Sequence, residues 1–237
     1  MMKSFPLALA ILLSFVLATP IQAQLSLRKD NPKKERKVAD KEEKAAIKKI
    51  KEKAVKEARK EAKRIGKKEG FVIFPGSLPL DKQLQHVWIK QYEENTNGTP
   101  KYIFADGNGV GKIQTAAEMQ AMEAAKLQLA GQISNEINQI IEAKIANDQL
   151  DRESGNSLSK FVAGSKNYII QHLGYVRPGF KVYRNVGKRD IEVFVKLYYN
   201  SEEAYEAAEK ALQAKARAEL EEEADELIDE LNELFDR

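Results

Sequence analysis

The stretch ADGNGVGK, residues 105–112, has the residue types of a phosphate-binding loop, because three alternating glycines precede a lysine. A Walker A loop needs the pattern G-x-x-x-x-G-K followed by Ser or Thr. Here Gly111 and Lys112 are followed by Ile113, and Asp106 occupies the position five residues before Gly111, where the first glycine belongs. The stretch therefore does not match a Walker A loop.

The dinucleotide fingerprint G-x-G-x-x-G is the second pattern with which this stretch can be compared. Gly107 and Gly109 match its first two glycines, but position 112 is lysine. The second parallel strand and the ribose-binding acid of that motif are also missing. The free amides of a following helix could still attract an anion. We expect residues 105–112 to connect a strand to a helix rather than to bind a nucleotide.

The side chains that most often carry enzyme chemistry are scarce in this sequence. It has no cysteine, which excludes disulfides, thiol nucleophiles and cysteine-based metal sites. The two histidines, His86 and His172, lie in separate segments without metal-ligand spacing, and we expect both at the surface or edge of amphipathic helices. Ser157, Ser159 and Ser165 lack the G-x-S-x-G context of a nucleophile elbow.

Carboxylates are abundant, and clusters such as EEEADE, residues 221–226, could attract calcium. The sequence shows no loop with the alternating Asp/Asn spacing around a glycine that an EF-hand requires. We therefore predict solvated helix faces rather than metal sites. No catalytic, cofactor-binding or metal-binding residue is predicted, no cofactor is expected, and the chain is not expected to be an enzyme.

Residues 1–23 have the layout of a secretory signal peptide. A positively charged start, MMK, is followed by the apolar run FPLALAILLSFVLA over residues 5–18, and the small residue Ala23 precedes Gln24. A membrane anchor is the alternative, but the run is shorter than the roughly 18–20 residues that span a bilayer. No cysteine follows the run to carry a lipid. We expect cleavage near Ala23–Gln24 and a periplasmic or otherwise exported mature protein, soluble or peripheral.

Charge divides the mature chain. Residues 28–70 hold nineteen Lys and Arg against nine Asp and Glu, and residues 201–237 hold four against fourteen. Both segments are rich in good helix formers, so we predict a basic helical extension over residues 24–70, ending at Gly66 or Gly70, and an acidic C-terminal helix over residues 201–237. Each has a thin apolar stripe: Ile47, Ile50, Ala54, Ala58, Ala62 and Ile65 in the first, and Ala216, Leu220, Ala224, Leu227, Leu231 and Leu234 in the second.

These two charged helices suit mutual packing, within one chain or between two chains. Opposite charges steer association, but an exposed ion pair contributes only about 0–1 kcal/mol, so the stripes would set most of the affinity. Tyr205, Leu212 and Phe235 are candidate contacts. An anionic lipid or acidic polymer is the alternative partner of the basic helix, although its stripe lacks the Trp and Phe that interfacial helices prefer. Nucleic acid is not expected, because no aromatic residues for base stacking interleave the charges.

The segment between them, residues 71–200, has the mixed pattern of a folded domain. We predict a helix from Leu80, a turn over residues 95–100 and a short strand over residues 101–105. A long amphipathic helix follows the glycines, and Thr115 with Glu118 has the spacing of a capping box. Its apolar face is formed by Met122, Ala125, Leu129, Ile133, Ile137 and Ile140.

The rest of this domain contains a second helix and a hairpin. A polar break over residues 147–156 precedes a helix over residues 157–174. FKVYR, residues 180–184, and DIEVFVKLYYN, residues 190–200, are strands joined by the turn NVGKR, and alternation in the second strand predicts one face against the helices. The order is β-α-α-β-β, which predicts an α+β fold with a mostly antiparallel sheet packed on helices.

The alternating glycines are followed by a helix with recurring alanines at positions 116, 117, 121, 124 and 125, and the domain closes on a Tyr- and Val-rich strand. Over about residues 100–200, this arrangement resembles the bacterial envelope lipoproteins of the LPP-twenty family and the related N-terminal domain of flagellar assembly protein T. The chain departs from that family in lacking the lipid-bearing cysteine and in its two charged helices. The resemblance implies an envelope protein of structural or interaction type, with no catalytic residues to carry over.

These observations favour an exported, non-catalytic cell-envelope protein that associates with itself or with a protein partner through its charged helices. A peripheral binder of the anionic envelope surface is the second hypothesis. An enzyme of an unrecognised kind is the third and least supported, because the sequence offers no constellation of catalytic side chains.

Overall fold

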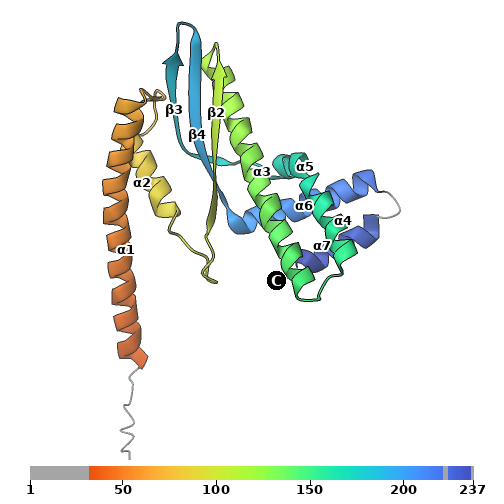
Figure 1. Ribbon diagram of the computed structural model, residues 1–237. Helices are drawn as coiled ribbons and strands as arrows, with labels where there is room; N and C mark the ends of the chain where they lie inside the picture. The colour runs from red at the N-terminus through yellow and green to blue at the C-terminus, as the bar shows by residue number, and fades with distance from the viewer. Residues whose placement is uncertain (1–31, 221–223, 236–237) are drawn as a thin grey trace, which may run out of the picture. The chain divides into compact units, whose positions relative to one another are not determined.

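The computed structural model describes residues 32–220 and 224–235, so the predicted signal peptide lies outside the described residues (Figure 1). The chain divides into two units, residues 1–43 and residues 44–237. In the first unit, residues 32–43 are helical and begin helix α1. The second unit contains the sheet and the remaining helices, and all side-chain contacts given below lie within it.

The second unit is an α+β domain, as the sequence predicts. Its elements are the end of α1 (Pro32–Lys63), a π-helical turn (Arg64–Lys68), β1 (Val72–Ile73), α2 (Leu80–Lys90), β2 (Tyr102–Gly111), α3 (Gln114–Ala146), α4 (Arg152–Ala163), α5 (Lys166–His172), β3 (Arg177–Val186), β4 (Asp190–Asn200), α6 (Ser201–Glu219) and α7 (Ala224–Phe235). The predicted helix from Leu80 and the predicted turn over residues 95–100 are confirmed.

The four strands form one antiparallel sheet in the order β1-β3-β4-β2. The β3–β4 hairpin confirms both predicted strands, and Gly187 supplies the positive φ of 64° that its turn requires. β1 is not among the predicted strands. It has only two residues, Val72 and Ile73, and these pair with β3, so its local pattern is too short to be distinguished from a loop.

Helices cover both faces of the sheet (Figure 1). On one face lies the inner core, where the first half of α3 packs on β2 and β4 and its second half packs on α4 to α7. On the other face lies the outer core, formed by α2, the end of α1 and outward side chains of the strands. The fully or nearly fully buried members of the outer core are Ala58, Ile65, Phe71, Leu84, Val87, Phe180 and Val182.

The glycine stretch is not a connector, contrary to the prediction. β2 continues through it from Tyr102 to Gly111 and pairs with β4 along its whole length. Glycine is depleted in strands because it has no side chain to pack and loses most entropy when ordered, so the local pattern indicates a turn. In the fold, pairing with β4 and packing against α3 keep these residues in a strand.

The glycines of β2 permit α3 to lie directly against the strand. A Cβ atom at Gly107 would lie 1.9 Å from the carbonyl oxygen of Ala121, and one at Gly109 would lie 2.3 Å from that of Ala117. The facing helix residues are small as well, since Ala117, Ala121 and Ala125 are all fully buried. The alternating glycines and the recurring alanines are therefore the two halves of one close strand–helix contact.

The predicted capping box is also absent. α3 begins at Gln114, directly after the extended residue Ile113, and no side-chain hydrogen bond caps it. Thr115 thus lies inside the first turn, where it cannot act as the N-cap. Glu118 instead accepts a hydrogen bond from the Nζ of Lys181 in β3 at 2.5 Å. The prediction failed because β2 extends so far that only two residues separate it from the helix.

The predicted helix over residues 157–174 starts earlier than expected. α4 begins at Arg152, because a side-chain oxygen of Asp151 accepts hydrogen bonds from the backbone N–H groups of Glu153 and Ser154, each at 2.9 Å. This is the usual way in which an aspartate satisfies the free amides of a first helical turn. The polar break is correspondingly shorter than predicted.

The same predicted helix is also broken into α4 and α5 after Ala163. The Oγ of Ser165 donates to the Phe161 carbonyl at 2.6 Å, and the Nζ of Lys215 on α6 donates to the same carbonyl at 3.2 Å. Lys215 is only 7% exposed. Its cation lies at the C-terminal end of α4, where the helix dipole favours positive charge. A contact with α6, far away in the sequence, therefore accompanies this break.

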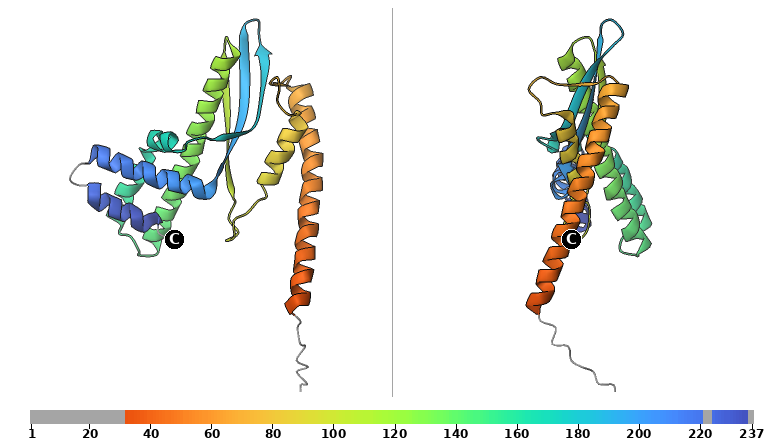
Figure 2. Two further views of the ribbon diagram at one scale, coloured as in Figure 1. Left: turned by 180° about the vertical axis from the view of Figure 1, so that it is seen from behind. Right: turned by 90° about the vertical axis from the view of Figure 1, so that its left-hand side faces the viewer.

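The acidic segment forms two helices, α6 and α7, rather than the single helix predicted. α7 packs back along α6 (Figure 2). This arrangement buries the apolar face of α7 in the chain's own core, whereas a continuous helix would carry it into solvent. Of the predicted stripe, Ala216, Ala224, Leu231 and Leu234 are buried and Leu220 and Leu227 are partly buried.

The three side chains predicted as contacts between the charged helices belong to this domain's inner core. Leu212 is fully buried, and Tyr205 and Phe235 pack partly buried against the same cluster. They therefore pack in the inner core, whereas the described side chains of α1 contribute to the outer core. Association of the charged helices between copies of the chain stays a prediction.

α1 is the predicted basic helix, and the structure confirms the anchoring part of its stripe. Ala54, Ala58 and Ile65 are buried, and the last two belong to the outer core. The helical backbone continues past Gly66 through the π-helical turn, so Gly66 is not the end. Gly70, with a φ of 76°, follows the turn and allows the chain to change direction.

A polar network on the outer face joins three strands. The carboxylate of Glu192 in β4 accepts hydrogen bonds from the Nδ2 of Asn108 in β2 at 2.7 Å and from the Nε of Arg184 in β3 at 2.6 Å. Arg184 also donates through Nη1 to the carbonyl of Glu69, before β1, at 2.7 Å. Burial opposes the ionised form of Glu192, but these hydrogen bonds outweigh it and hold its pKa below the ordinary value of 4.5.

We expect this network to make stability depend on pH in the acid range. Because the folded-state pKa of Glu192 is depressed, its stabilisation is present above about pH 4.5 and is lost as the pH falls through the folded-state pKa. Glu192→Gln should lower the free energy of unfolding at pH 7 by about 1.5–3 kcal/mol, with a smaller difference at pH 3. Urea denaturation at both pH values measures this; an equal loss at both would contradict the role of the charge.

Candidate functional site

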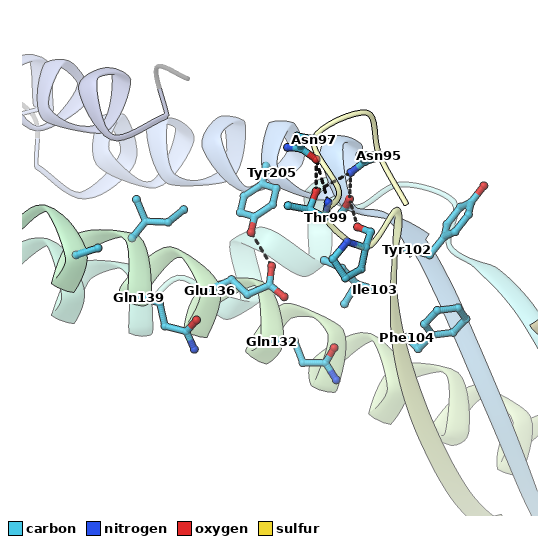
Figure 3. Close-up of a pocket in the computed structure, with 14 residues that line it drawn as sticks. Asn95, Asn97, Thr99, Tyr102, Ile103, Phe104, Gln132, Glu136, Gln139 and Tyr205 are labelled. Atoms are coloured by element: carbon cyan, nitrogen blue, oxygen red, sulfur yellow. Dashed lines mark hydrogen bonds between the residues drawn. The ribbon is translucent and has the colours of Figure 1, made fainter. Parts of the chain in front are cut away.

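A groove of about 790 Å³ lies between the turn before β2, the first residues of β2, the middle of α3 and the start of α6 (Figure 3). Only the fold brings these four segments together. Amides, hydroxyls and apolar groups dominate the lining, and Glu136 is its one charged residue. The principal polar residues are Asn95, Asn97, Thr99, Gln132, Glu136, Gln139, Ser201 and Tyr205.

One wall of the groove is a turn tied to α6. The N–H of Asn95 donates to the Thr99 carbonyl at 2.8 Å, and Gly98 has the positive φ of 79° that closes the turn. The Nδ2 of Asn95 donates to the Oγ of Ser201 at 3.1 Å, and that hydroxyl donates to the Pro100 carbonyl at 2.9 Å. The turn is thereby held against the first residue of α6.

The opposite wall is one side of α3. Gln132, Glu136 and Gln139 follow one another at helical spacing and line the groove. The hydroxyl of Tyr205 on α6 donates to Oε2 of Glu136 at 2.6 Å and joins the two helices (Figure 3). Among the described residues, no hydrogen bond engages the side-chain amides of Gln132 and Gln139. Their donors and acceptors are thus available to a ligand.

The floor of the groove includes the outer edge of β2, which is an edge strand of the sheet. Elsewhere along this edge, α3 covers the backbone: the N–H of Asp106 donates to Oε1 of Gln128 at 2.7 Å, and that of Val110 donates to Oε1 of Gln120 at 3.2 Å. Successive residues of a strand direct their N–H groups to opposite sides. The N–H of Phe104 therefore points to the same edge as those of Asp106 and Val110.

The chemistry available in the groove is hydrogen bonding. A single carboxylate, already bonded to a tyrosine hydroxyl, does not form the acid–base pair that hydrolysis of a glycosidic bond or an ester requires. Within residues 32–220 and 224–235, no group of three or more His, Asp or Glu side chains is placed to hold a metal ion. The site is suited to binding a polar, extended ligand.

A second, smaller pocket of about 220 Å³ combines tyrosines with cations. The Nζ of Lys90 lies 4.0 Å from the ring centre of Tyr102 and 4.8 Å from that of Tyr198. Arg177 and the 80% exposed Tyr175 complete its rim. The charge of Lys90 already occupies the tyrosine faces, which leaves less room for a further cation.

Of the residues singled out in the sequence, Tyr205 and Ile140 line the groove, and the candidates for chemistry lie outside it. Gly107 and Gly109 pair with β4 and lie directly against α3. His86 and His172 are exposed, as predicted, and Nδ1 of His172 lies 2.8 Å from the Tyr168 carbonyl oxygen. The sequence analysis did not identify the groove or its polar residues as a site, although glutamines at positions 120, 128 and 132, multiples of four apart, are a signal for one polar line along α3.

Two surfaces of opposite charge complete the candidate sites. From Lys44 to Lys68, the chain has twelve Lys and Arg and only three Glu. Most of these cations are exposed, among them Lys49, Lys53 and Lys56 along one side of α1. The exposed carboxylates of α6 and α7 are those of Glu202, Glu203, Glu206, Glu219, Asp225, Glu226, Asp229 and Glu233.

No helix in the described part of the chain is both long and apolar enough to cross a membrane. Comparison of the chain with protein-family models, with curated proteins and with solved structures finds no match.

Proposed function

We propose that this chain is an exported, non-catalytic protein of the cell envelope, of structural or interaction type, that associates through its charged helices. The observation that carries this proposal is the basic surface over residues 44–68. The few apolar side chains of this segment anchor α1 to the outer core. The cations that the segment exposes are therefore available to a partner. The signal-peptide pattern and the resemblance to the LPP-twenty family support export and an envelope location.

The first partner to consider is the acidic surface of α6 and α7 on a second copy of the chain. The apolar stripes of these helices are covered by their own domain, so charge would drive such an association. Long-range charge attraction between exposed groups is screened by salt, with a Debye length of about 10 Å at 0.1 M and about 3 Å at 1 M. A charge-driven dimer should therefore dissociate as salt is added.

Light scattering on residues 24–237 at low and high salt tests this proposal. We expect a dimer at low salt that becomes a monomer at about 1 M salt. The variant Lys49→Glu, Lys53→Glu, Lys56→Glu should be monomeric at both. Lys112→Glu, Lys188→Glu, Arg189→Glu changes the net charge equally at exposed sites outside α1 and should behave like the unchanged protein. A monomer at low salt, or equal effects of both variants, would contradict self-association through α1.

The second candidate function is peripheral binding of an anionic envelope surface. The observation that favours it is the excess of exposed cations on residues 44–68, where twelve Lys and Arg stand against only three Glu. Flotation with anionic vesicles and sedimentation with an acidic polymer, using the same two triple variants, would distinguish it from self-association. Export is tested by a separate measurement, the N-terminal residue of the secreted chain, which should be Gln24.

A further inference from the structure

We propose that the groove binds an extended peptide segment carrying a lysine or arginine, which adds as a fifth strand to the edge of β2. This interaction is distinct from the charge-driven association proposed above, because the lysines of α1 do not line the groove. The proposal rests on the edge of β2, on the side chains that face it and on the charge of the lining.

The first argument is that side chains of α3 cover the edge of β2 at Asp106 and Val110, whereas none in the described part of the chain accepts a hydrogen bond from the edge where the groove lies. Gln120 and Gln128 occupy the edge amides of Val110 and Asp106. Eight helix residues advance about 12 Å and four strand residues advance about 13 Å, so the two elements stay in register. Half of this interval, four residues further along α3 and two residues further along β2, places Gln132 beside Phe104.

At Phe104, no glutamine of α3, a helix described over its whole length, accepts a hydrogen bond from the strand edge. Gln132 lines the groove with Phe104 but makes no hydrogen bond among the described residues. In Figure 3 the rings of Tyr102 and Phe104 point away from Gln132 and Glu136, whereas Ile103 between them packs into the inner core with α3, so the rings leave the strand edge at Phe104 open to the groove. A strand edge with accessible N–H and C=O groups is the structure on which peptides add in β-augmentation.

The second argument is that the lining suits a peptide. The amides of Gln132 and Gln139 each offer donors and an acceptor, which is what the outer edge of an added strand requires. Ile140 and Ala143 supply apolar surface to the same groove. The groove volume of about 790 Å³ falls in the range of ligand sites, about 300–1,000 Å³.

The third argument is electrostatic. Glu136 is the one charged residue of the lining, and its Oε2 already accepts from Tyr205. The other carboxylate oxygen can accept from a cation of the ligand, and a carboxylate disfavours an acidic ligand at the same place. An extended peptide with a central Lys or Arg therefore fits better than an acidic one.

A peptide array tests the proposal, using pentapeptides with Lys, Arg, Gln or Glu at the centre between β-branched residues. The strongest binder is then titrated into isotope-labelled residues 24–237, followed by the amide signals. We expect central Lys or Arg to bind at least tenfold more tightly than Glu, and the Phe104 amide to shift and to become protected from exchange. Methylation of alternate peptide nitrogens removes the strand hydrogen bonds and should weaken binding at least tenfold.

Three variants sharpen the test. Glu136→Gln should remove the preference for a basic residue while Tyr205 can still donate to the new amide oxygen. Glu142→Gln, an exposed change on the same helix outside the groove, should preserve it. Gln128→Ala uncovers the N–H of Asp106, lengthens the available edge and should tighten binding several-fold.

Several results would overturn the proposal. These are the absence of binding across the array, unchanged affinity after methylation of the peptide, or amide shifts that leave Phe104 unaffected. Binding of an oligosaccharide, such as a tetramer of N-acetylglucosamine, in place of every peptide would assign the groove to sugars instead. The triple α1 variant should bind peptide like the unchanged chain, so failure of the charged-helix proposal and failure of this one are separate results.

Discussion

Replacing Gly107 by alanine should destabilise the domain by about 3 kcal/mol or more, at or beyond the upper end of the usual cost of overpacking. The added Cβ would lie 1.9 Å from the carbonyl oxygen of Ala121 and 2.7 Å from the backbone nitrogen of Ala125. Both are backbone atoms of α3, so no side chain can rotate away to relieve the contact. The helix would have to move off the strand and lose part of the inner core. Urea denaturation of residues 24–237 measures the loss.

Gly131→Ala is the matched control for this change. Gly131 lies in the interior of α3, and a Cβ there would meet no atom within 4 Å. Alanine is a better helix former than glycine by about 0.5–1 kcal/mol, so this variant should be slightly more stable than the unchanged chain. If Gly107→Ala behaved like Gly131→Ala, the close packing of β2 on α3 would be wrong.

Leu129→Ala should lower the free energy of unfolding by about 2–5 kcal/mol, the usual cost of emptying a leucine site in a core. Leu129 is fully buried in the inner core. It belongs to the middle of α3, between the half that packs on the sheet and the half that packs on α4 to α7. A cavity there removes contacts that hold these two parts together. Chemical denaturation followed by far-ultraviolet circular dichroism measures the effect.

Leu127→Ala, two residues earlier on the same helix, provides the comparison. Leu127 is 50% exposed, so the change removes little buried surface and introduces a better helix former. We expect a change within about 0.5 kcal/mol, as for most surface substitutions. Comparable losses for the two leucines would show that α3 does not present the face described here.

The sequence predicts elements well where a local pattern is complete. The alternation in residues 190–200 and the glycine turn before it predict the β3–β4 hairpin, because a strand with one buried face must alternate. The helices of the charged segments follow from composition, and the exposure of His86 and His172 follows from their position on amphipathic helices. The α+β class follows from the order of these elements.

Local patterns mislead where a distant segment decides the structure. Residues 105–112 indicate a turn by composition, yet they form a strand because β4 pairs with them and α3 lies against them. The helix predicted over residues 157–174 is interrupted where Lys215 reaches the end of α4. The acidic segment turns back as α7 because the inner core offers a place for its apolar face.

By itself, then, the sequence determined the fold class, the main hairpin, the helical nature of both charged ends and the scarcity of catalytic side chains. These properties depend on composition and on periods of two or 3.6 residues, which neighbouring residues reveal. Only the tertiary structure decided the use of the glycines, the ends of several helices and the groove. The groove depends on contacts between segments far apart in the sequence, such as Tyr205 to Glu136 and Asn95 to Ser201. The use of the glycines depends on the pairing of β2 with β4 and on the way α3 folds back onto the strand, and no local pattern encodes such contacts.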